Sequence, residues 1–395
     1  MKTTTRVGTG RSLSRDAAEA GREAVAQAQA SMDGQKPQIV LLFATAGHDQ
    51  QALVAAVGEA SGAPVIGCSG EGVISEAGSD EGSHAVSLAM IASDEIGFHP
   101  FSISGLSKDP AACALELARR VKQTPVQGRL LLLFPDGVTA QFGDFFKTLD
   151  QALPYPITVA GGSAGDMLSF QKTFQYAGGE ARSDSLSALL ISGKVDPQLV
   201  ISHGCGLIGS EQQVTAVDGG EMLEINHEPA WEYFRRYLPE ETQTLNGMHV
   251  AHLVVAERLA QPIDEFGEFL IRVPLRLDSN RGSLFFAAGI AKGTTVQMAL
   301  RDAPSVASRA EEAARELRAS RKEPPLLVIE LNCAGRGRLL FGEQTNERLI
   351  KPQQRAFESG TPWVGLHTFG EIAPLGGKTQ FHNYTGVLVA LFPSR

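Results

Sequence analysis

A repeated unit is the feature that most constrains the fold of this chain. Three stretches, residues 37–92, 128–193 and 324–392, share one order of elements. Each has an apolar strand, a loop with an amphipathic helix, a Pro-led strand that enters a Gly-rich turn, and a closing apolar strand. Three matches in the same strand–helix–strand context indicate a common structural unit.

The spacing inside the turn supports this interpretation. In the first and third copies, the proline is followed by glycines after three and eight residues, and in the second copy by a glycine after nine. The residues are Pro64, Gly67 and Gly72 in the first copy, Pro156 and Gly165 in the second, and Pro362, Gly365 and Gly370 in the third. The repeat therefore reflects more than shared composition.

The periodicity of the apolar residues predicts the fold class. Residues 39–43 form an unbroken apolar run, which is typical of a strand buried on both faces, whereas residues 142–149 place phenylalanines and a leucine on one face of a helix. Residues 269–302 contain alternating segments typical of half-buried antiparallel strands. We expect a mixed α/β chain of the α+β class, with two lobes of mixed β-sheet covered by helices.

The length of 395 residues predicts two domains, since a single core usually serves about 100 to 200 residues. We place the boundary in the Gly219–Asn226 region, which gives domains 1–222 and 223–395. No low-complexity linker separates them. The two lobes are therefore expected to pack closely.

Composition excludes several functional classes. The chain has 35 basic and 44 acidic residues, a formal charge of −9, and no basic block, which argues against nucleic acid as a partner. It has neither a signal-peptide pattern nor an apolar run of membrane-spanning length, so we expect a cytoplasmic protein without a membrane span. The four cysteines form no CxxC pair, which predicts reduced thiols.

A catalytic interpretation rests on GGSAG, residues 161–165, which matches the GxSxG pattern around Ser163. A nucleophile elbow needs a helix after the serine, and the residues that follow read as extended. A Gly-rich turn with close backbone passage is the competing interpretation. A hydrolase using Ser163 stays as an alternative.

The segment CAGRG of the third copy carries a thiol and a guanidinium. Cys333 ends a strand, and Arg336 follows in a Gly-containing turn. Arginine can hold a carboxylate with two hydrogen bonds, and cationic neighbours would activate the Cys333 thiolate. The alternative is a turn whose arginines are solvated.

Two turns carry an acid directly after glycine, Asp166 after Gly165 and Glu371 after Gly370. If the copies pack around one cleft, both carboxylates could contact the amine of a ligand. Alternatively, each acid accepts backbone N–H groups and holds its own turn. Both interpretations stay open.

At this point the sequence resembles a known family. GCSGEGVIS, GGSAGDMLSF, ISHGCGLIG, FLIRVPLRLD, NCAGRG, FGEIAP and FHNYTG, in this order, resemble FIST (F-box and intracellular signal transduction) domains, N-terminal and C-terminal in tandem. The resemblance covers nearly the whole chain. It implies a sensory module for small ligands such as amino acids, with a histidine kinase or a cyclic-nucleotide signalling enzyme as partner.

The resemblance also implies site residues. Its motif positions are Asp166, Arg336, Glu371, His382 and Asn383. Further candidates for the pocket are Cys333, His367 and Glu71. The first turn departs from the family pattern, because Val73 follows Gly72 and the acid is displaced to Glu71.

The leading hypothesis is a non-enzymatic sensor without a cofactor. Arg336 would hold the carboxylate of an amino-acid-like ligand, Asp166 or Glu371 its amine, and His382 with Asn383 would orient the acid. The second hypothesis is a haem-binding nitric-oxide sensor that regulates a histidine kinase, with the haem on a histidine. The candidates are His84, His203 and His382. We assign no metal site.

Overall fold

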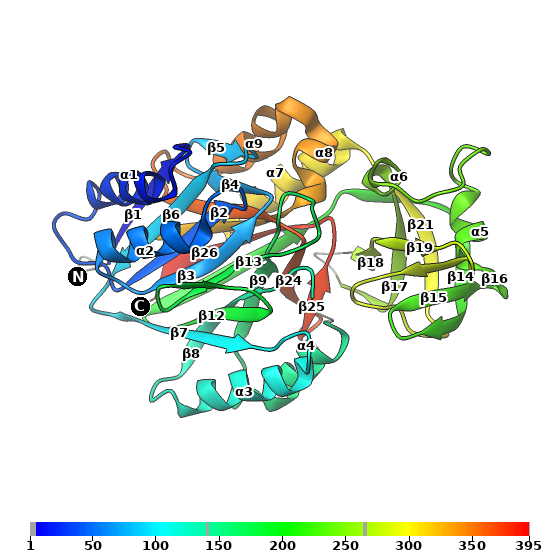
Figure 1. The fold of residues 1–395 in the computed structure, drawn as a ribbon, viewed down its shortest axis with the longest axis horizontal. Helices are drawn as coiled ribbons and strands as arrows, with labels where there is room; N and C mark the ends of the chain where they lie inside the picture. Colours follow the sequence, from blue (N-terminus) through cyan, green and yellow to red (C-terminus); the bar gives the residue numbers. More distant parts are fainter. Residues whose placement is uncertain (1–4, 140–141, 264–266, 395) are drawn as a thin grey trace.

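The computed structural model describes residues 5–139, 142–263 and 267–394. It confirms the α+β class, because helices cover mixed β-sheets. Figure 1 shows a large body and a smaller lobe that joins it on one side. The body holds the three copies of the repeat, and residues 205–301 form the lobe.

The three copies fold alike. In each, the first strand pairs in parallel with the strand that enters the Gly-rich turn and antiparallel with the closing strand. The elements of the first copy are β2 (Ile39–Thr45), α2 (Gln50–Ser61), β3 (Val65–Gly70), β4 (Gly72–Ser75), β5 (Gly78–Asp80) and β6 (Val86–Ala92). Those of the second are β8 (Gly128–Pro135), α4 (Gly143–Ala152), β9 (Thr158–Ser163), β10 (Gln175–Ala177), β11 (Glu180–Arg182) and β12 (Ser185–Gly193).

The third copy has short helical turns where the others have one helix. Its elements are β22 (Leu327–Cys333), η1 (Ala334–Arg336), α8 (Arg338–Phe341), η2 (Gly342–Gln344), η3 (Asn346–Ile350), α9 (Lys351–Gln354), β23 (Trp363–Thr368), β24 (Gly370–Leu375), β25 (Lys378–His382) and β26 (Gly386–Pro393). The predicted repeat is thus present in all three copies.

A leading strand and a helix precede every copy, so the structural repeat is longer than the pattern in the sequence. The strands are β1 (Arg6–Ser12), β7 (Ile96–Ser104) and β13 (Val195–Ser202), and the helices are α1 (Ala17–Gln29), α3 (Pro110–Gln123) and α7 (Ala303–Ala319). Each strand forms one edge of a six-stranded sheet. In the third repeat, the lobe is inserted between β13 and α7.

The repeats exchange hairpins in a cycle. The orders of the three sheets are β1-β6-β2-β3-β10-β11, β7-β12-β8-β9-β24-β25 and β13-β26-β22-β23-β4-β5. The second repeat thus completes the first sheet, the third completes the second, and the first completes the third. Residues on both sides of the boundary at 222 and 223 share two of these sheets. The inner faces of all three sheets form one apolar core.

A ring of backbone hydrogen bonds joins the three turns at one end of the body. In each turn, a backbone N–H group donates to a backbone carbonyl oxygen in the turn of another repeat. The bonds run from Glu71 N to His367 O (2.9 Å), from Gly165 N to Ser69 O (3.0 Å) and from Phe369 N to Ser163 O (3.2 Å). The turns that share the sequence pattern are therefore in direct contact.

One glycine of each copy is required by close contact between two parallel strands. A Cβ atom on Gly67, Gly161 or Gly365 would lie 1.9, 1.9 or 2.1 Å from a carbonyl oxygen of the neighbouring parallel strand. Backbone atoms at this distance leave no space for any side chain. The glycines therefore permit the close parallel pairing of β2 with β3, β8 with β9 and β22 with β23.

The lobe is mostly antiparallel sheet with its own apolar core. Its strands follow the order β18-β17-β21-β14-β15-β20-β19, and β16 pairs with β15. The elements are β14 (Cys205–Asp218), β15 (Glu221–Ile225), β16 (Glu228–Pro229), α5 (Ala230–Arg235), α6 (Gly247–His252), β17 (Leu253–Ile263), β18 (Gly267–Arg272), β19 (Arg276–Asp278), β20 (Ser283–Phe285) and β21 (Thr295–Arg301). The prediction of antiparallel strands in residues 269–302 is confirmed, because β18 and β21 both pair antiparallel with β17. Burial alternates from Thr295 to Met298 of β21, whereas Phe269 to Arg272 of β18 are all buried.

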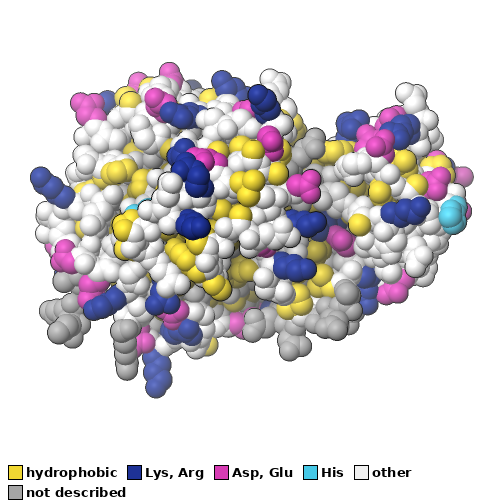
Figure 2. Space-filling view, turned by 90° about the horizontal axis from the view of Figure 1, so that it is seen from below, with side chains coloured by type: hydrophobic (Ala, Val, Ile, Leu, Met, Phe, Trp, Pro, Cys, Tyr) yellow, Lys and Arg dark blue, Asp and Glu magenta, His cyan; other side chains and the backbone are white. Residues whose placement is uncertain are grey.

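Figure 2 shows basic and acidic side chains interspersed on the face seen from below. Within the described residues, no helix combines the length and apolar character that a membrane crossing requires.

Candidate functional site

Arg336 is the centre of a buried polar cluster where the lobe joins the body. It ends η1, the turn that follows β22. Its side chain is fully buried. The Nη1 atom donates to the carbonyl and hydroxyl oxygens of Ser202, the last residue of β13. A Cβ atom on Gly386 would lie 2.8 Å from Nη1, so glycine makes room for the guanidinium group.

The remaining donors of this guanidinium are not used by the protein. Nε and Nη2 of Arg336 are buried and have no hydrogen-bond partner among the described residues. Burial lowers the Arg336 pKa to about 10, although the nearby Glu371 carboxylate opposes this shift. Guanidinium groups keep their charge at neutral pH, so Arg336 is a buried cation with free donors.

Glu371 lies near this cation and also holds its own turn. Its carboxylate accepts the hydroxyl groups of Thr368 (2.7 Å) and Thr385 (2.8 Å) and the Thr385 N–H group (3.1 Å). Burial raises the Glu371 pKa to about 7, and these hydrogen bonds and Arg336 limit the shift. These bonds match the interpretation of Glu371 as an acid that holds its own turn, and the structure also places it near Arg336. Contact with the amine of a ligand stays a prediction.

Glu330 is a third charged member, and our sequence reasoning missed it. It lies in β22 and accepts the Trp363 indole N–H at 2.9 Å and the side-chain amide groups of Gln353 (3.0 Å) and Asn332 (3.2 Å). Burial raises the Glu330 pKa to about 7, and Arg336 acts in the opposite direction. The signal was present as the single charged residue of a mostly apolar strand, LVIELNC.

Arg301 connects the cluster to the lobe. It ends β21 and donates from Nη2 to the carbonyl oxygen of Gly335 at 2.7 Å. Its guanidinium lies 3.5 Å from the centroid of the Tyr384 ring. Cys205, at the start of β14, is paired in register with Arg301. Both chain segments that cross between body and lobe therefore contact the η1 turn, one through Ser202 and the other through Arg301.

Asp166 holds a different loop. Its carboxylate accepts the backbone N–H groups of Phe170 (2.8 Å), Gln171 (2.6 Å) and Lys172 (2.9 Å). Its own N–H group donates to Glu71 at 2.8 Å, and burial raises the Glu71 pKa to about 7. These contacts match the prediction that the acid of this turn binds its own backbone.

The alignment of Asp166 with Glu371 differs in the structure. The ring of backbone bonds pairs Gly165 with Glu71 and Phe369, so Asp166 corresponds to Gly370 and not to Glu371. Between the proline and this donor lie two more residues in the second copy than in the other two, since Gly165 follows Pro156 by nine residues whereas Glu71 and Phe369 follow their prolines by seven. Arg336 and Glu371 therefore form one cluster, and Asp166 with Glu71 forms another.

His382 and Asn383 lie where β25 ends, and both are buried. His382 faces Glu371 in register across β24 and β25. Its Nε2 atom is 3.1 Å from the carbonyl oxygen of Ala373, and burial lowers the His382 pKa to about 3. A neutral imidazole bound to backbone thus lies beside the cluster.

Cys333 ends β22, and His367 lies one residue before the end of the parallel strand β23; both are buried. Burial raises the Cys333 pKa well above its usual value, so the expectation of an activated thiolate is wrong. His367 Nε2 lies 2.8 Å from the Ser79 hydroxyl, and burial lowers its pKa. The low polarity around Cys333 outweighs its cationic neighbours.

The other histidines proposed for haem, His203 and His84, each contact a neighbouring residue through Nδ1. His203 Nδ1 accepts the Cys205 N–H group at 3.0 Å, and His84 Nδ1 lies 2.8 Å from the Ser83 hydroxyl. A groove of about 780 Å³ between β13, α7 and the β24–β25 turn has no histidine among its described lining residues. The described surroundings of these histidines do not fit a haem pocket.

Ser163 ends β9 and is fully buried. Its hydroxyl donates to the carbonyl oxygen of Gly370 at 3.3 Å, and no helix begins directly after it. Neighbouring Gly162 would place a Cβ atom 2.4 Å from Thr368. These contacts support a Gly-rich turn with close backbone passage.

Replacing His48 with phenylalanine is expected to change the pH dependence of stability. Both ring nitrogens of His48 are buried without a partner among the described residues, and the ring lies 5.1 Å from the His84 ring. Burial, with a smaller effect of His84, lowers the His48 pKa to about 4. Only the unfolded chain binds a proton between pH 6.5 and 4, so the wild type loses stability as the pH falls through this range.

Since His48→Phe removes this loss, its unfolding free energy relative to the wild type should rise by about 2 kcal/mol between pH 7 and pH 4.5. Urea titrations at both pH values measure the difference. His84→Phe is the control for removing the neighbouring ring. An unchanged difference at the two pH values for His48→Phe would contradict the assignment.

Comparisons with known proteins place the chain among uncharacterised relatives. A protein of Mycobacterium tuberculosis is 29% identical over 412 aligned positions, which cover 98% of this chain and 99% of the relative. A protein of Mycobacterium bovis is 27% identical over 419 positions, with 98% of each chain covered.

Two enzymes of known structure show only distant similarity. A chorismatase is 10% identical in sequence, and the alignment covers 99% of this chain and 98% of the chorismatase chain with a TM-score of 0.34. A cyanuric acid hydrolase of A. caulinodans is 8% identical in sequence, and the alignment covers 49% of this chain and 72% of the hydrolase chain with a TM-score of 0.26. Similarity at this level carries no functional argument.

The family models match most of the chain. The model of the FIST N domain matches residues 38–228, and the model of the FIST C domain matches residues 230–374. The two matches follow one another in the order that the motifs predict. The chain therefore belongs to the FIST family, with a FIST N domain and a FIST C domain in tandem.

Proposed function

We propose that this chain is a non-enzymatic sensor whose input is a small ligand with a carboxylate group, such as an amino acid, bound by Arg336. FIST domains are signal-transduction sensor domains. The observation that carries the proposal is the buried Arg336 guanidinium, whose Nε and Nη2 donors have no partner among the described residues. A carboxylate can accept from two such donors at once.

The acids of the cluster favour an amino acid over a simple carboxylic acid. Glu371 and Glu330 both have a pKa raised to about 7 by burial. An ammonium group near Glu371 would stabilise its ionised form, because an opposite charge lowers the pKa of a carboxyl group. Arg336 and Glu371 would thus bind the two ends of one zwitterion. His382 and Asn383 lie beside this pair as candidates that orient the acid.

The position of the cluster suggests how binding becomes a signal. Ser202 and Arg301 belong to the two segments that cross between body and lobe, and each is bound to the η1 turn. A ligand that binds Nε and Nη2 and moves the guanidinium group would change these contacts. The orientation of the lobe would then shift, provided that the ligand binds one arrangement more tightly than the other.

The output is proposed to pass through a protein partner. The family resemblance suggests a histidine kinase, which would place the sensor in the cytoplasm. The expectation of a haem-binding nitric-oxide sensor is not carried further, because the described residues around His84, His203 and His382 do not form a haem pocket.

Ligand binding should depend on Arg336 and on the carboxylate of the ligand. Isothermal titration with a panel of free amino acids is expected to find binders, and the decarboxylated amine of each binder should fail to bind. Arg336→Met should weaken binding at least about 100-fold, because two charge-assisted hydrogen bonds are lost. Arg336→Lys, which keeps the charge without the paired donors, should restore only part of the affinity.

Arg338→Met is the matched control. Arg338 lies two residues further along the chain, and its side chain is 59% exposed. It should bind as the wild type does. The proposal fails if no amino acid binds the wild type, or if Arg336→Met remains folded and binds with unchanged affinity.

A further inference from the structure

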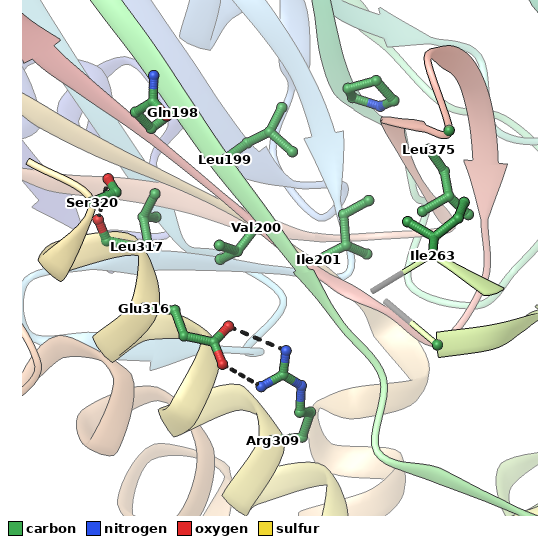
Figure 3. A pocket seen from close by; sticks show the side chains of 13 residues that line it. Gln198, Leu199, Val200, Ile201, Ile263, Arg309, Glu316, Leu317, Ser320 and Leu375 are labelled. Atoms are coloured by element: carbon green, nitrogen blue, oxygen red, sulfur yellow. Dashed lines mark hydrogen bonds and ion pairs between the residues drawn. The ribbon is translucent and has the colours of Figure 1, made fainter. Parts of the chain in front are cut away.

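The outer edge of β13 borders a groove of about 780 Å³. Four consecutive residues, Gln198 to Ile201, line it. Because successive side chains of a strand point to opposite faces, a run of four means that the edge of the strand, and not one face, borders the groove. Figure 3 shows β13 between α7, with Arg309 and Glu316, and the side that carries Leu375 and Ile263.

The hydrogen-bond register shows which backbone groups point into the groove. The carbonyl oxygen of Leu391 in β26 accepts from the Leu326 N–H group, which lies on the side of β26 opposite to β13. In β13, the residue paired with Leu391 is Pro197. Opposite residues of two antiparallel strands alternate between pairs that hydrogen-bond to each other and pairs whose backbone groups point away from each other. Pro197, Leu199 and Ile201 therefore direct their backbone groups away from β26. Proline has no N–H group, so Leu199 and Ile201 supply the outward donors.

On the corresponding edges of the other two sheets, a side chain binds an outward backbone group. On β1, the Arg11 N–H group donates to the side chain of Gln27 at 3.1 Å. On β7, the Ser102 carbonyl oxygen accepts from Arg120 at 3.2 Å. Among the described residues, no hydrogen bond uses the outward N–H and C=O groups of Leu199 and Ile201. Within the described part of the chain, the edge of the third sheet therefore lacks the side-chain bond to an outward backbone group that each of the other two edges has.

We propose that this groove binds an extended segment of a partner polypeptide, which adds to β13 as an antiparallel or parallel strand. Exposed strand edges pair readily with another backbone, and several peptide-recognition domains use this mode. The walls select apolar side chains at alternate positions, since Leu199, Ile201 and Leu375 line the groove. Arg309 and Glu316 bind each other at 2.8 Å, so no net charge is required of the segment.

A single extended segment fits this site better than a second copy of the chain. The edge is recessed, with α7 on one side and the β24–β25 turn on the other. A second β13 would bring the same two walls with it, and these would collide before the edges could pair. A peptide strand has no such walls.

The groove also spans the junction between body and lobe. Ile263 and Gly267 belong to the lobe, whereas β13, α7 and residues 374–376 belong to the body. A change in lobe orientation would therefore change the width of the groove. This link to ligand binding rests on the proposed function, but the docking of a peptide does not.

A phage-displayed library of random peptides, selected against the folded full-length protein, tests the inference. The selected peptides should carry apolar residues at alternate positions. On synthetic peptides, fluorescence anisotropy should show affinity reduced at least about tenfold by Leu199→Pro and by Ile201→Pro, because each removes one outward donor and places a ring against the incoming strand. Neither change removes a hydrogen bond to β26. Pro197, two residues before Leu199, shows that β13 accepts proline at positions whose backbone groups point outward.

Ser102→Pro, at an outward position of β7, is the matched control and should bind peptides as the wild type does. Hydrogen exchange of the wild type gives a second measurement, in which the selected peptide should slow exchange at Leu199 and Ile201. Four results would overturn the proposal: no selected binder, binders unaffected by both proline variants, unchanged exchange at the two amides, or wild-type dimers that pair through this edge.

Discussion

Replacing Gly161 with alanine is expected to lower the unfolding free energy by about 3 kcal/mol or more. A Cβ atom at this position would lie 1.9 Å from the carbonyl oxygen of Leu133 and 2.8 Å from its carbonyl carbon. Both are backbone atoms of β8, which is held between β9 and β12 in the middle of its sheet. The strands can accommodate the methyl group only by separating, and this would disturb the ring that joins the three turns. Urea titration followed by circular dichroism measures the loss.

Gly58→Ala provides the matched control. Gly58 lies within α2, and a methyl group at this position would have a Val65 carbon as its nearest neighbour, at 3.8 Å. Alanine favours the helix by up to about 1 kcal/mol, so this variant should equal or exceed the wild type in stability. If Gly161→Ala loses less than Gly58→Ala, the close strand pairing is not what requires glycine.

Replacing Glu330 with leucine is expected to cost about 3 kcal/mol at pH 5.5. The carboxyl group accepts hydrogen bonds from Trp363, Gln353 and Asn332. Leucine would leave the buried donors of Trp363 and Asn332 without this acceptor, whereas Gln353 would keep its bond to the Leu349 carbonyl oxygen. At pH 5.5, Glu330 is protonated in the folded protein because burial raises its pKa to about 7. The measured loss at this pH therefore reports the hydrogen bonds and contains little contribution from burying a charge.

Glu330→Gln is the control, because glutamine keeps the shape and one acceptor oxygen. Its stability at pH 5.5 should lie within about 1 kcal/mol of the wild type. The unfolded carboxyl group ionises near pH 4.5 and the folded one near pH 7, so the wild type loses stability as the pH rises between these values. Relative to the wild type, Glu330→Gln should therefore gain about 3 kcal/mol between pH 5 and pH 8. A constant difference across this range would contradict the raised pKa.

The repeated unit could be predicted from the sequence because its causes are local. The glycine three residues after Pro64 and the one three residues after Pro362 are required by carbonyl oxygens of the neighbouring strand. The apolar runs of β2, β8 and β22 likewise reflect burial on both faces. The exchange of hairpins has no such local cause. β4 begins two residues after β3 in the chain but pairs with β23, nearly 300 residues away.

The candidate site was predictable only in part. Arg336 and Glu371 belong to motifs of the third copy, and the structure brings them together. Arg301 joins them from the end of a lobe strand, and no spacing in the sequence relates it to Arg336. Asp166 was expected at the same cleft, but its carboxylate is occupied by the next residues of its own loop. Pairings between distant segments decide these positions.

The cyclic exchange of hairpins has a consequence for biosynthesis. The third sheet contains β4 and β5 from the beginning of the chain and β26 from its end, so it cannot assemble until residue 393 has left the ribosome. Translation proceeds at about 5 to 20 residues per second, so the early hairpin waits for roughly 15 to 60 seconds with its pairing edges unoccupied. Nascent chains of this protein are therefore expected to need protection by a chaperone until β26 has emerged.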